Sequence, residues 1–301
     1  MRVLATYIMR GRMQAVVVVA VFMLLSFVLP PLSILSASAV SLVSLRGGQR
    51  EGMITIMGAA LAVGILGQGL LDSSGFVVAY ALGFWFPVWI FAVLLRVSGQ
   101  LCFTLEIGLG LGLVAIVAIY LFGSDPAVLW QERLGMILEP LATNPPPGVE
   151  LGQIETSIQA ISHYMTGILV TGAIVSLVLA MLLGRWWQAM LYNPGGFREE
   201  FLSLRPRSSV AYIFLGVFLL AGMENGLLSE GMRNACILGF FFYLIIGVSV
   251  VHVLISATRM KGVLLPAIYI LMFFVPWALL PVALAGYTDA WVNWRGRVLA
   301  N

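Results

Sequence analysis

The sequence predicts an all-α integral membrane protein, a bundle of eight or nine transmembrane helices with short interfacial helices. Hydrophobic residues make up 61% of the chain and charged residues only 10%. Soluble domains are about 45–50% apolar. The second observation is a series of apolar runs near the ~20 residues that a helix needs to cross a bilayer. These runs fill the chain, so we expect one membrane domain over 1–301, with helices in 1–184, a cytoplasmic interfacial segment at 185–207 and helices in 208–301.

Nine apolar runs mark the expected spans. They are 13–29, 32–45, 53–71, 75–95, 101–122, 161–183, 210–228, 235–255 and 263–284. The first run follows three arginines, and Ala37-Ser38-Ala39 resembles a signal-peptide cleavage site. That site lies inside the second apolar run, so we expect the first span to remain uncleaved. Between the fifth and sixth runs, residues 129–139 have the 3-to-4 spacing of a short amphipathic surface helix.

The run 32–45 is short, about 21 Å as a helix, and either crosses the membrane or re-enters it. Charge distribution favours crossing, because the N-terminus and twelve of the sixteen Lys and Arg residues then lie in the cytoplasm. Without that crossing the division is nine to seven. The nine-span assignment puts the C-terminus outside, with Arg295 and Arg297 on an external surface helix anchored by Trp291 and Trp294. In this setting the net charge of +3 reports topology and predicts no nucleic-acid partner.

The segment 185–207 is the most polar and specific stretch of the chain. We expect the preceding helix to end at Arg185, with two tryptophans at the headgroup level, and Asn193-Pro-Gly-Gly196 to stop it. A short interfacial helix should follow, with phenylalanines on one side and charges on the other. It is either a solvated anchor or a docking surface for a protein partner. The candidate docking residues are Trp186, Trp187, Asn193, Phe197, Arg198, Glu200, Phe201 and Arg205.

Glu106 is the only acidic residue well inside an apolar run. A carboxylate at that depth is costly unless it is paired, protonated or faces water. Two interpretations remain open. One is a structural pair with Arg96 across the turn that precedes the run, and the other is a proton or substrate site.

A second polar cluster is expected at the outer ends of two spans. Glu224 and Asn225 lie near the end of 210–228, and Gln68 and Asp72 lie near the end of 53–71. A few convergent polar groups in an apolar surrounding predict a pocket for a small ligand. The alternative is that Glu224 pairs with Arg233.

No reaction can be inferred from the sequence. It contains none of the common hydrolase, metalloprotease or nucleotide motifs, and Cys102 and Cys236 have no metal-ligand spacing. His163 and His252 lie at opposite ends of their runs, so each is interpreted as an interfacial residue. We therefore predict no catalytic residues, no metal and no cofactor, and a protein that is not an enzyme.

The run of spans, with the segment Trp186-Trp187…Asn193-Pro-Gly-Gly-Phe197-Arg-Glu-Glu-Phe201…Leu204-Arg205, resembles the YybS-like family of uncharacterised bacterial inner-membrane proteins. The similarity covers most of the chain. That family is remotely similar to the S components of energy-coupling-factor transporters, which implies a helical fold with an outward-facing ligand pocket. S components dock to a coupling subunit through Ala-x-x-x-Ala on their first helix. Here the first run lacks that pattern, and the nearest analogue is Ser33/Ala37/Ser41 in the second.

Two functional hypotheses follow, both for a multi-pass protein of a bacterial inner membrane with a cytoplasmic N-terminus. The first is a small-molecule-binding or transport component, which rests on the outer polar cluster and on the resemblance. The second is a non-transporting scaffold or assembly factor that recruits a membrane or cytoplasmic protein through 185–207. Lipid handling is a third alternative.

Overall fold

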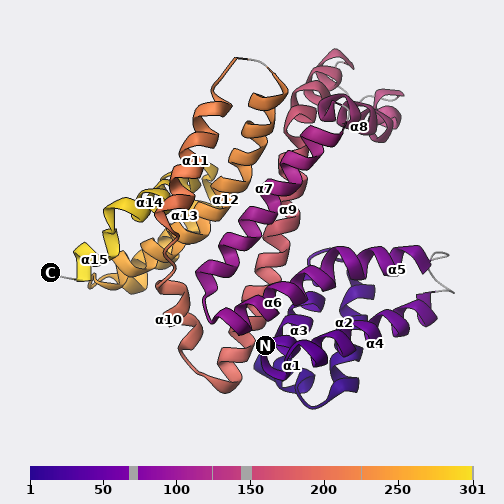
Figure 1. Ribbon diagram of the computed structural model, residues 1–301, viewed down its shortest axis with the longest axis vertical. Helices are drawn as coiled ribbons and strands as arrows, with labels where there is room; N and C mark the ends of the chain where they lie inside the picture. Colours follow the sequence, from indigo (N-terminus) through magenta and orange to yellow (C-terminus); the bar gives the residue numbers. More distant parts are fainter. Residues whose placement is uncertain (68–73, 124, 144–150, 225, 300–301) are drawn as a thin grey trace. The chain divides into compact units, whose positions relative to one another are not determined.

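A computed structural model describes residues 1–67, 74–123, 125–143, 151–224 and 226–299, and all regular structure in these residues is helical (Figure 1). Four of its helices are long and apolar enough to cross a membrane: Val77–Ser98, Leu101–Phe122, Gly152–Tyr192 and Leu227–Ser256. The prediction of an all-α protein is therefore confirmed, and its membrane character is supported by these four helices.

The chain forms two compact units. Unit 1 comprises Met1–Gly108 and Val175–Leu204, and unit 2 comprises Leu109–Ile174 and Arg205–Asn301. Two long helices, α7 (Leu101–Phe122) and α9 (Leu151–Tyr192), contribute residues to both units. Single-domain organisation stays a prediction.

Unit 1 is built around α3. Its other helices are α1 (Arg2–Ile8), α2 (Arg12–Leu25), α4 (Gln49–Gly67), α5 (Ser74–Tyr80), the π-helical turn η1 (Ala81–Trp85), α6 (Phe86–Ser98), α10 (Gly196–Leu202) and parts of α7 and α9. α3 spans Leu32–Gly47, and every residue from 36 to 45 is buried. The apolar run predicted at 32–45 is thus a helix that lies inside the unit.

Serines on α3 bind neighbouring helices. Ser36 Oγ donates a hydrogen bond to Val19 O on α2 (2.8 Å) and accepts one from Trp85 Nε1 (3.0 Å). On the other side α9 comes so close that a Cβ added to Gly184 would lie 2.5 Å from Ser41 Oγ. Small residues that permit close approach and interhelical hydrogen bonds are the usual means of association in lipid. α3 is therefore the packing centre of unit 1.

An ion pair links α2 to α4 at the unit surface. Arg12 Nε donates to Glu51 Oε2 at 2.8 Å, and both side chains are partly or largely exposed. The hydrogen bond from Arg12 lowers the pKa of the Glu51 carboxyl. Both residues lie just outside the apolar runs, where charged groups at a membrane boundary are expected.

Unit 2 is built around α12 (Leu227–Ser256). Its other elements are α8 (Pro126–Thr143), α11 (Ser208–Ala221), α13 (Lys261–Phe274), the 3-10 turn η2 (Pro276–Ala278), α14 (Leu279–Val292), α15 (Trp294–Leu299) and parts of α7 and α9. Glycines let two helices approach α12 closely. Gly239 faces the Phe214 ring of α11, and Gly247 of α12 and Gly286 of α14 each face backbone of the opposite helix with no room for a Cβ.

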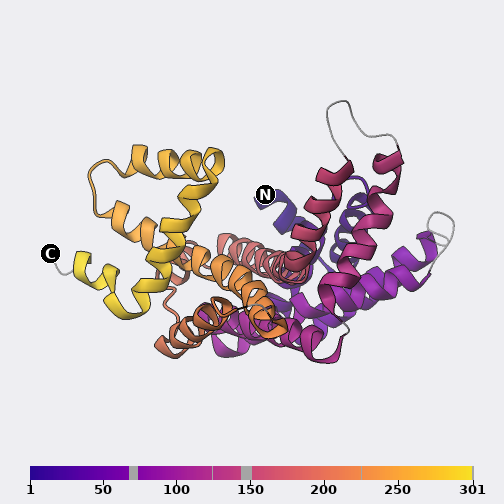
Figure 2. The same cartoon turned by 90° about the horizontal axis from the view of Figure 1, so that it is seen from above.

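The observed helix bounds correct several predicted spans. The run 101–122 coincides with α7, and the surface helix expected at 129–139 lies within α8. By contrast, the expected helix end at Arg185 is wrong, because α9 continues to Tyr192. One continuous helix over 263–284 is also wrong. Val275 precedes Pro276 and is extended, as steric clash with a following proline favours, and Figure 2 shows the chain turning sharply between α13 and α14.

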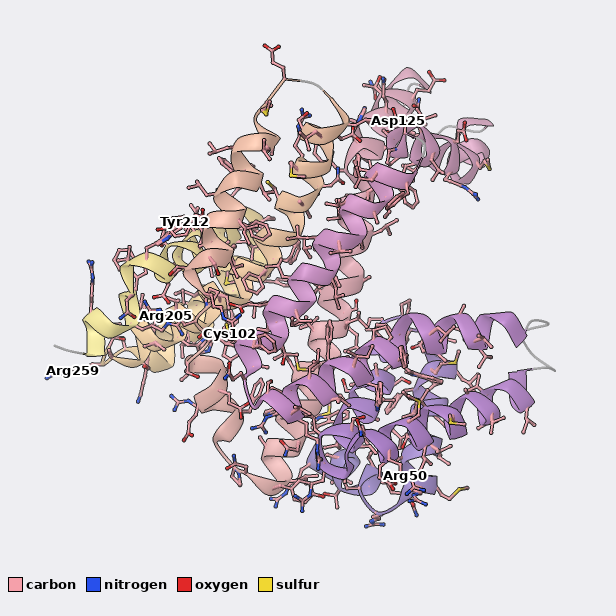
Figure 3. The ribbon with its side chains drawn as sticks, in the orientation of Figure 1. Arg50, Cys102, Asp125, Arg205, Tyr212 and Arg259 are labelled. Atoms are coloured by element: carbon pink, nitrogen blue, oxygen red, sulfur yellow. The ribbon has the colours of Figure 1, made fainter. Side chains whose placement is uncertain are left out.

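Arg295, expected on an external surface, is buried in an ion pair. Its Nη2 and Nε donate to Asp289 Oδ2 at 2.7 and 3.1 Å, and its Nη1 donates to Ser249 Oγ on α12 at 3.3 Å. Arg259, just after α12, and Asp125, just after α7, lie at opposite ends of unit 2 (Figure 3). Because Ser249 is near the Arg259 end of α12, Arg295 belongs to that end.

We expect Arg295→Met to destabilise the protein by about 3–5 kcal/mol, because it leaves the buried Asp289 carboxylate without its cation. The matched control is Arg297→Met, two residues along α15, where the side chain is exposed and a change of less than about 0.5 kcal/mol is expected. Denaturant unfolding of both variants in mild detergent measures the difference. Equal stabilities would contradict the role of this ion pair.

Candidate functional site

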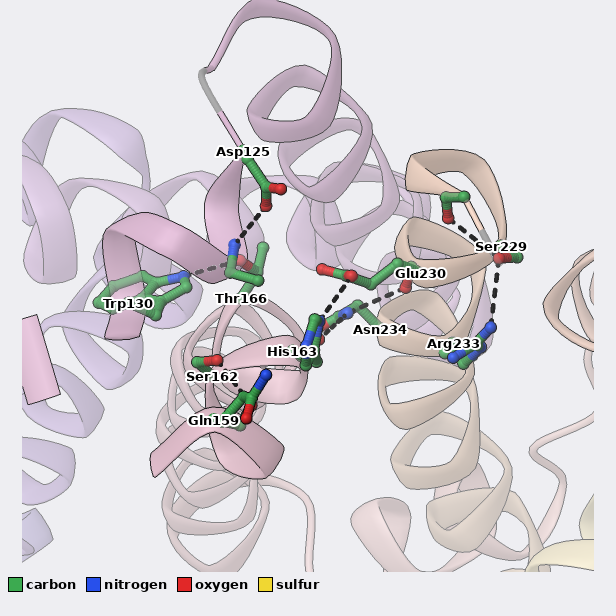
Figure 4. A network of polar contacts seen from close by, with 12 residues as sticks. Asp125, Trp130, Gln159, Ser162, His163, Thr166, Ser229, Glu230, Arg233 and Asn234 are labelled. Atoms are coloured by element: carbon green, nitrogen blue, oxygen red, sulfur yellow. Dashed lines mark hydrogen bonds and ion pairs between the residues drawn. The ribbon is translucent and has the colours of Figure 1, made fainter. Parts of the chain in front are cut away.

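The densest polar network of the described residues joins α7, α9 and α12 inside unit 2 (Figure 4). We call Tyr120, His163, Glu230 and Asn234 the α7–α9–α12 cluster. Tyr120 Oη donates to Glu230 Oε1 at 2.9 Å, and His163 Nδ1 lies 2.8 Å from Glu230 Oε2. The carboxylate of α12 thus receives one partner from each of the other two helices.

Asn234 fixes the backbone of α9. Its Nδ2 donates to His163 O (2.7 Å), and its Oδ1 accepts from Gly167 N (2.5 Å). These two backbone groups are four residues apart and would bond each other in a regular α-helix. The carboxamide, fully buried, therefore bridges them from α12.

The same amide nitrogen completes the network within hydrogen-bond distance of Tyr120 Oη (2.9 Å) and Glu230 O (2.9 Å). Such close approach requires glycine at position 167, where a Cβ would lie 2.7 Å from Asn234 O. A Cβ at Gly231 would lie 3.3 Å from the Tyr120 ring. Two glycines and one asparagine therefore set how the three helices meet.

α8 closes one side of this arrangement. Trp130 Nε1 donates to Thr166 Oγ1 of α9 at 2.8 Å, and Thr166 is buried. The start of α8 is capped by Asp125, whose Oδ1 accepts from Ala127 N at 3.0 Å. A side-chain cap of this kind satisfies a backbone donor that the helix leaves unpaired. Trp130 is thus held against the helix that carries His163.

Exposure differs sharply between the two ionisable members. The Glu230 side chain is 15% exposed and His163 is 46% exposed. A carboxylate between apolar helices is costly unless it is hydrogen-bonded, and here Tyr120 and His163 supply those bonds. Because the imidazole is the accessible partner, a cationic or hydroxyl-bearing molecule can replace it at Glu230. Proton exchange between the histidine and the carboxylate is the other chemistry available to this pair.

The ligand residues predicted from sequence are placed only in part. Glu224 is exposed between α11 and α12, six residues before Glu230, whereas Gln68, Asp72 and Asn225 lie outside the described residues. Arg233 donates to Ala221 O at 3.3 Å and to Ser229 Oγ at 3.2 Å. A ligand role for Glu224 stays a prediction.

Arg96, the proposed partner of Glu106, binds backbone carbonyls at the C-terminal end of α3. Its Nη1 donates to Leu45 O (2.6 Å) and Arg46 O (2.9 Å), which places a cation where the helix dipole favours one. Glu106 is half-buried on α7. The pair of Glu106 with Arg96 and the proton or substrate role of Glu106 both stay predictions.

Within the segment 185–207, the buried Arg185 joins α9 to α10. Its Nε donates to Glu200 Oε2 at 2.9 Å, its Nη2 contacts Glu200 Oε1, and its Nη1 contacts Gln188. Glu200 is thus held by an ion pair between α9 and α10.

The other candidate docking residues divide by exposure. Trp187 is fully buried and Trp186 is exposed. Phe197 and Phe201 are half-buried, with ring centroids 6.0 Å apart. Asn193, Arg198 and Arg205 are exposed. In unit 1, the accessible candidates are therefore Trp186, Asn193, Arg198 and the two half-buried rings.

His252 lines a small apolar pocket between α12 and α13 that also holds Tyr269. Tyr269 Oη lies 3.3 Å from His252 Nε2, and His252 Nδ1 lies 2.9 Å from Val248 O. The remaining lining is aliphatic apart from Met272. No group of three or more His, Cys, Asp or Glu residues in the described ranges is arranged to hold a metal ion.

Sequence reasoning missed Tyr120 and Asn234 and treated His163 as an isolated interfacial residue. The usable signal was a polar residue at each of three span ends, together with Gly167 and Gly231 at helix positions. Which of these residues meet depends on how the helices are rotated. No known protein family, curated protein or solved structure matches the chain.

Asn234→Asp should lower the thermal stability of the protein. The substitution keeps the size of the side chain but replaces the Nδ2 donor with an oxygen that faces the carbonyls of His163 and Glu230. An unsatisfied buried polar group costs about 1–3 kcal/mol, and more if it is charged. Thermal unfolding in detergent measures the loss.

The control is Gln159→Glu, the same amide-to-carboxylate change at an exposed position of α9. It should unfold at the wild-type temperature. If Asn234→Asp did so as well, the bridge from α12 to the α9 backbone would have no energetic importance.

Proposed function

We propose that this chain is a multi-pass protein of a bacterial inner membrane that binds a small polar solute at the α7–α9–α12 cluster, as a solute-binding or transport component. The observation that carries the proposal is the His163–Glu230 pair, with Nδ1 and Oε2 2.8 Å apart and the imidazole half exposed. α7, α9 and α12 are three of the four helices long and apolar enough to cross a membrane.

Physical chemistry supports a site at this position. An ionisable group among apolar helices is by default a functional candidate, because burying it is costly. Convergent polar groups in an otherwise apolar surrounding are typical of small-ligand sites. Glu230 would accept hydrogen bonds from a cationic or hydroxyl-rich solute, while Tyr120 and Asn234 hold the carboxylate in place. The resemblance to S-component-like transporters agrees with this function.

A membrane orientation follows from the same proposal. With the N-terminus in the cytoplasm, the basic residues on the inner side include Arg96, Arg185, Arg205 and Arg259, as the positive-inside rule favours. The cluster then lies at the outer ends of α7 and α12, since Glu230 is at the end of α12 remote from Arg259. A solute would reach His163 from outside the cell.

Glu230→Gln should weaken solute binding without unfolding the protein. The probe is a panel of amines, polyols and amino-substituted heterocycles, screened by the rise in unfolding temperature of the purified protein. A solute present at a hundred times its Kd stabilises by about 2.7 kcal/mol. Loss of a charge-assisted hydrogen bond worth about 1.5–3 kcal/mol should lower the affinity about tenfold or more.

Glu155→Gln, the same change at an exposed acid of α9, is the matched control and should bind as the wild type does. If no panel member or copurified compound stabilises the wild type, or if Glu230→Gln binds it equally well, the cluster is not the solute site.

A scaffold function is the second candidate, favoured by α10. The Arg185–Glu200 ion pair holds this helix, on which Arg198 is exposed and the rings of Phe197 and Phe201 are half-buried. Arg205, the first residue of unit 2 after this helix, is also exposed. A fixed, mixed-charge face on the cytoplasmic side would suit a protein partner.

Arg198→Glu combined with Arg205→Glu should abolish copurification of a specific protein if the scaffold hypothesis is right, because the charge of the docking face is reversed. Crosslinking in membranes followed by mass spectrometry measures the loss. Solute-induced stabilisation should be unchanged in this variant. Retention of every copurifying protein would remove the scaffold hypothesis.

A further inference from the structure

The C-terminal hairpin, residues 261–292, begins with an exposed apolar helix, α13. α13 contains no buried residue, although ten of its fourteen residues are large and apolar or aromatic. Exposure is greatest where the two helices meet, at Phe273 (81%), Phe274 (74%) and Trp277 (81%). Exposing such an apolar surface to water is unfavourable in free energy.

Both helices of the hairpin are shorter than the hydrocarbon core of a bilayer. α13 and α14 have 14 residues each, or about 21 Å, against a hydrocarbon core of ~30 Å. They cannot act as one longer span, because Val275 and Pro276 interrupt the helix and the chain turns there (Figure 2).

The hairpin returns to the end of α12 at which it begins. α13 starts at Lys261, five residues after α12 ends at Ser256. After α14, Arg295 donates to Ser249 Oγ of α12, and Ala290 O accepts from Ser208 Oγ at the start of α11. Ser249 is nineteen residues from Glu230, about 29 Å along α12. Both ends of the hairpin therefore lie away from the α7–α9–α12 cluster.

Two contacts hold the hairpin against α12. Tyr269 Oη on α13 lies within hydrogen-bond distance of His252 Nε2 on α12. The backbone of Val282 on α14 packs against Gly247 of α12. Arg259 and Lys261 at its start and Arg297 just after its end are exposed. The hairpin thus has basic ends and an aromatic tip.

We propose that the C-terminal hairpin is a re-entrant element that inserts into the cytoplasmic leaflet, with its aromatic tip among the acyl chains and its basic ends at anionic headgroups. Charge complementarity selects lipid as the occupant, since cations flank the apolar surface on the side where anionic lipids attract them. The inference rests on the membrane location in the proposed function. It brings Arg295 and Arg297 to the cytoplasm, so fourteen of the sixteen basic residues lie there, the earlier twelve and these two.

The test uses single cysteines in a chain with Cys102 and Cys236 replaced by alanine. The positions are Glu224 and Lys261, at the two ends of α12, together with Trp277 at the tip and Arg297 after the hairpin; all four are exposed. A membrane-impermeant maleimide is applied to sealed right-side-out and inside-out vesicles. A fluorophore on Trp277→Cys is then quenched with lipids that carry nitroxides along the acyl chain.

We expect Lys261→Cys and Arg297→Cys to react from the same face, and Trp277→Cys to react from neither face until detergent is added. The fluorophore at Trp277→Cys should be quenched by the acyl-chain nitroxides. Reaction of Arg297→Cys from the face opposite to Lys261→Cys would show a crossing helix and overturn the inference. So would reaction of Trp277→Cys in sealed vesicles, or absence of quenching, which would indicate a protein cover.

The position Glu224 separates this inference from the proposed function. If Glu224→Cys and Lys261→Cys react from opposite faces, α12 spans the membrane, and the result for Arg297→Cys judges the hairpin alone. If they react from the same face, the proposed membrane topology fails first.

Discussion

The bridge from Asn234 to the backbone of α9 is the interaction on which the candidate site depends. A carboxamide offers a donor and an acceptor in one plane, so it can pair with His163 O and Gly167 N at the same time. This holds the turn that carries His163 beside the turn that carries Glu230. Without it, the 2.8 Å contact between imidazole and carboxylate would have no fixed geometry. The network is fully connected, which in a low-dielectric surrounding rigidifies helix packing.

The other end of α12 is organised by a second polar contact of different character. Asp289 and Arg295 form a buried pair, and Ser249 joins them to α12. Buried ion pairs are weak evidence for stability but strong constraints on geometry, because a misplaced partner leaves a charge unpaired. Here the constraint returns the chain to α12 after the hairpin. One helix thus carries the α7–α9–α12 cluster and the buried ion pair about 29 Å apart.

The packing centre of unit 1 relies on small residues. Ser36 binds α2 and η1, and Gly184 lets α9 lie against Ser41. The hydrophobic effect gives little preference between helix and lipid, so close packing and hydrogen bonds must hold such helices together. Arg185 follows Gly184 directly on α9, and its ion pair with Glu200 positions α10. A candidate docking face is thereby linked to the packing of α3.

Composition and run length alone determined the all-helical class, the helix at 101–122 and the break at Asn193-Pro194, because helix formation and chain reversal depend on local residues. The break at Pro276 was missed, since 263–284 was predicted as one continuous span. The polar contacts were decided only by tertiary structure. Asn234, Tyr120 and His163 are more than forty residues apart in sequence, and helices that are apolar on nearly every side give no periodic signal of which face meets which neighbour. Arg295 looked like a surface charge because its nearest acid, Asp289, is six residues away on the other side of a left-handed turn at Asn293. Only that turn, together with the approach of Ser249, brings the two charges together inside the unit.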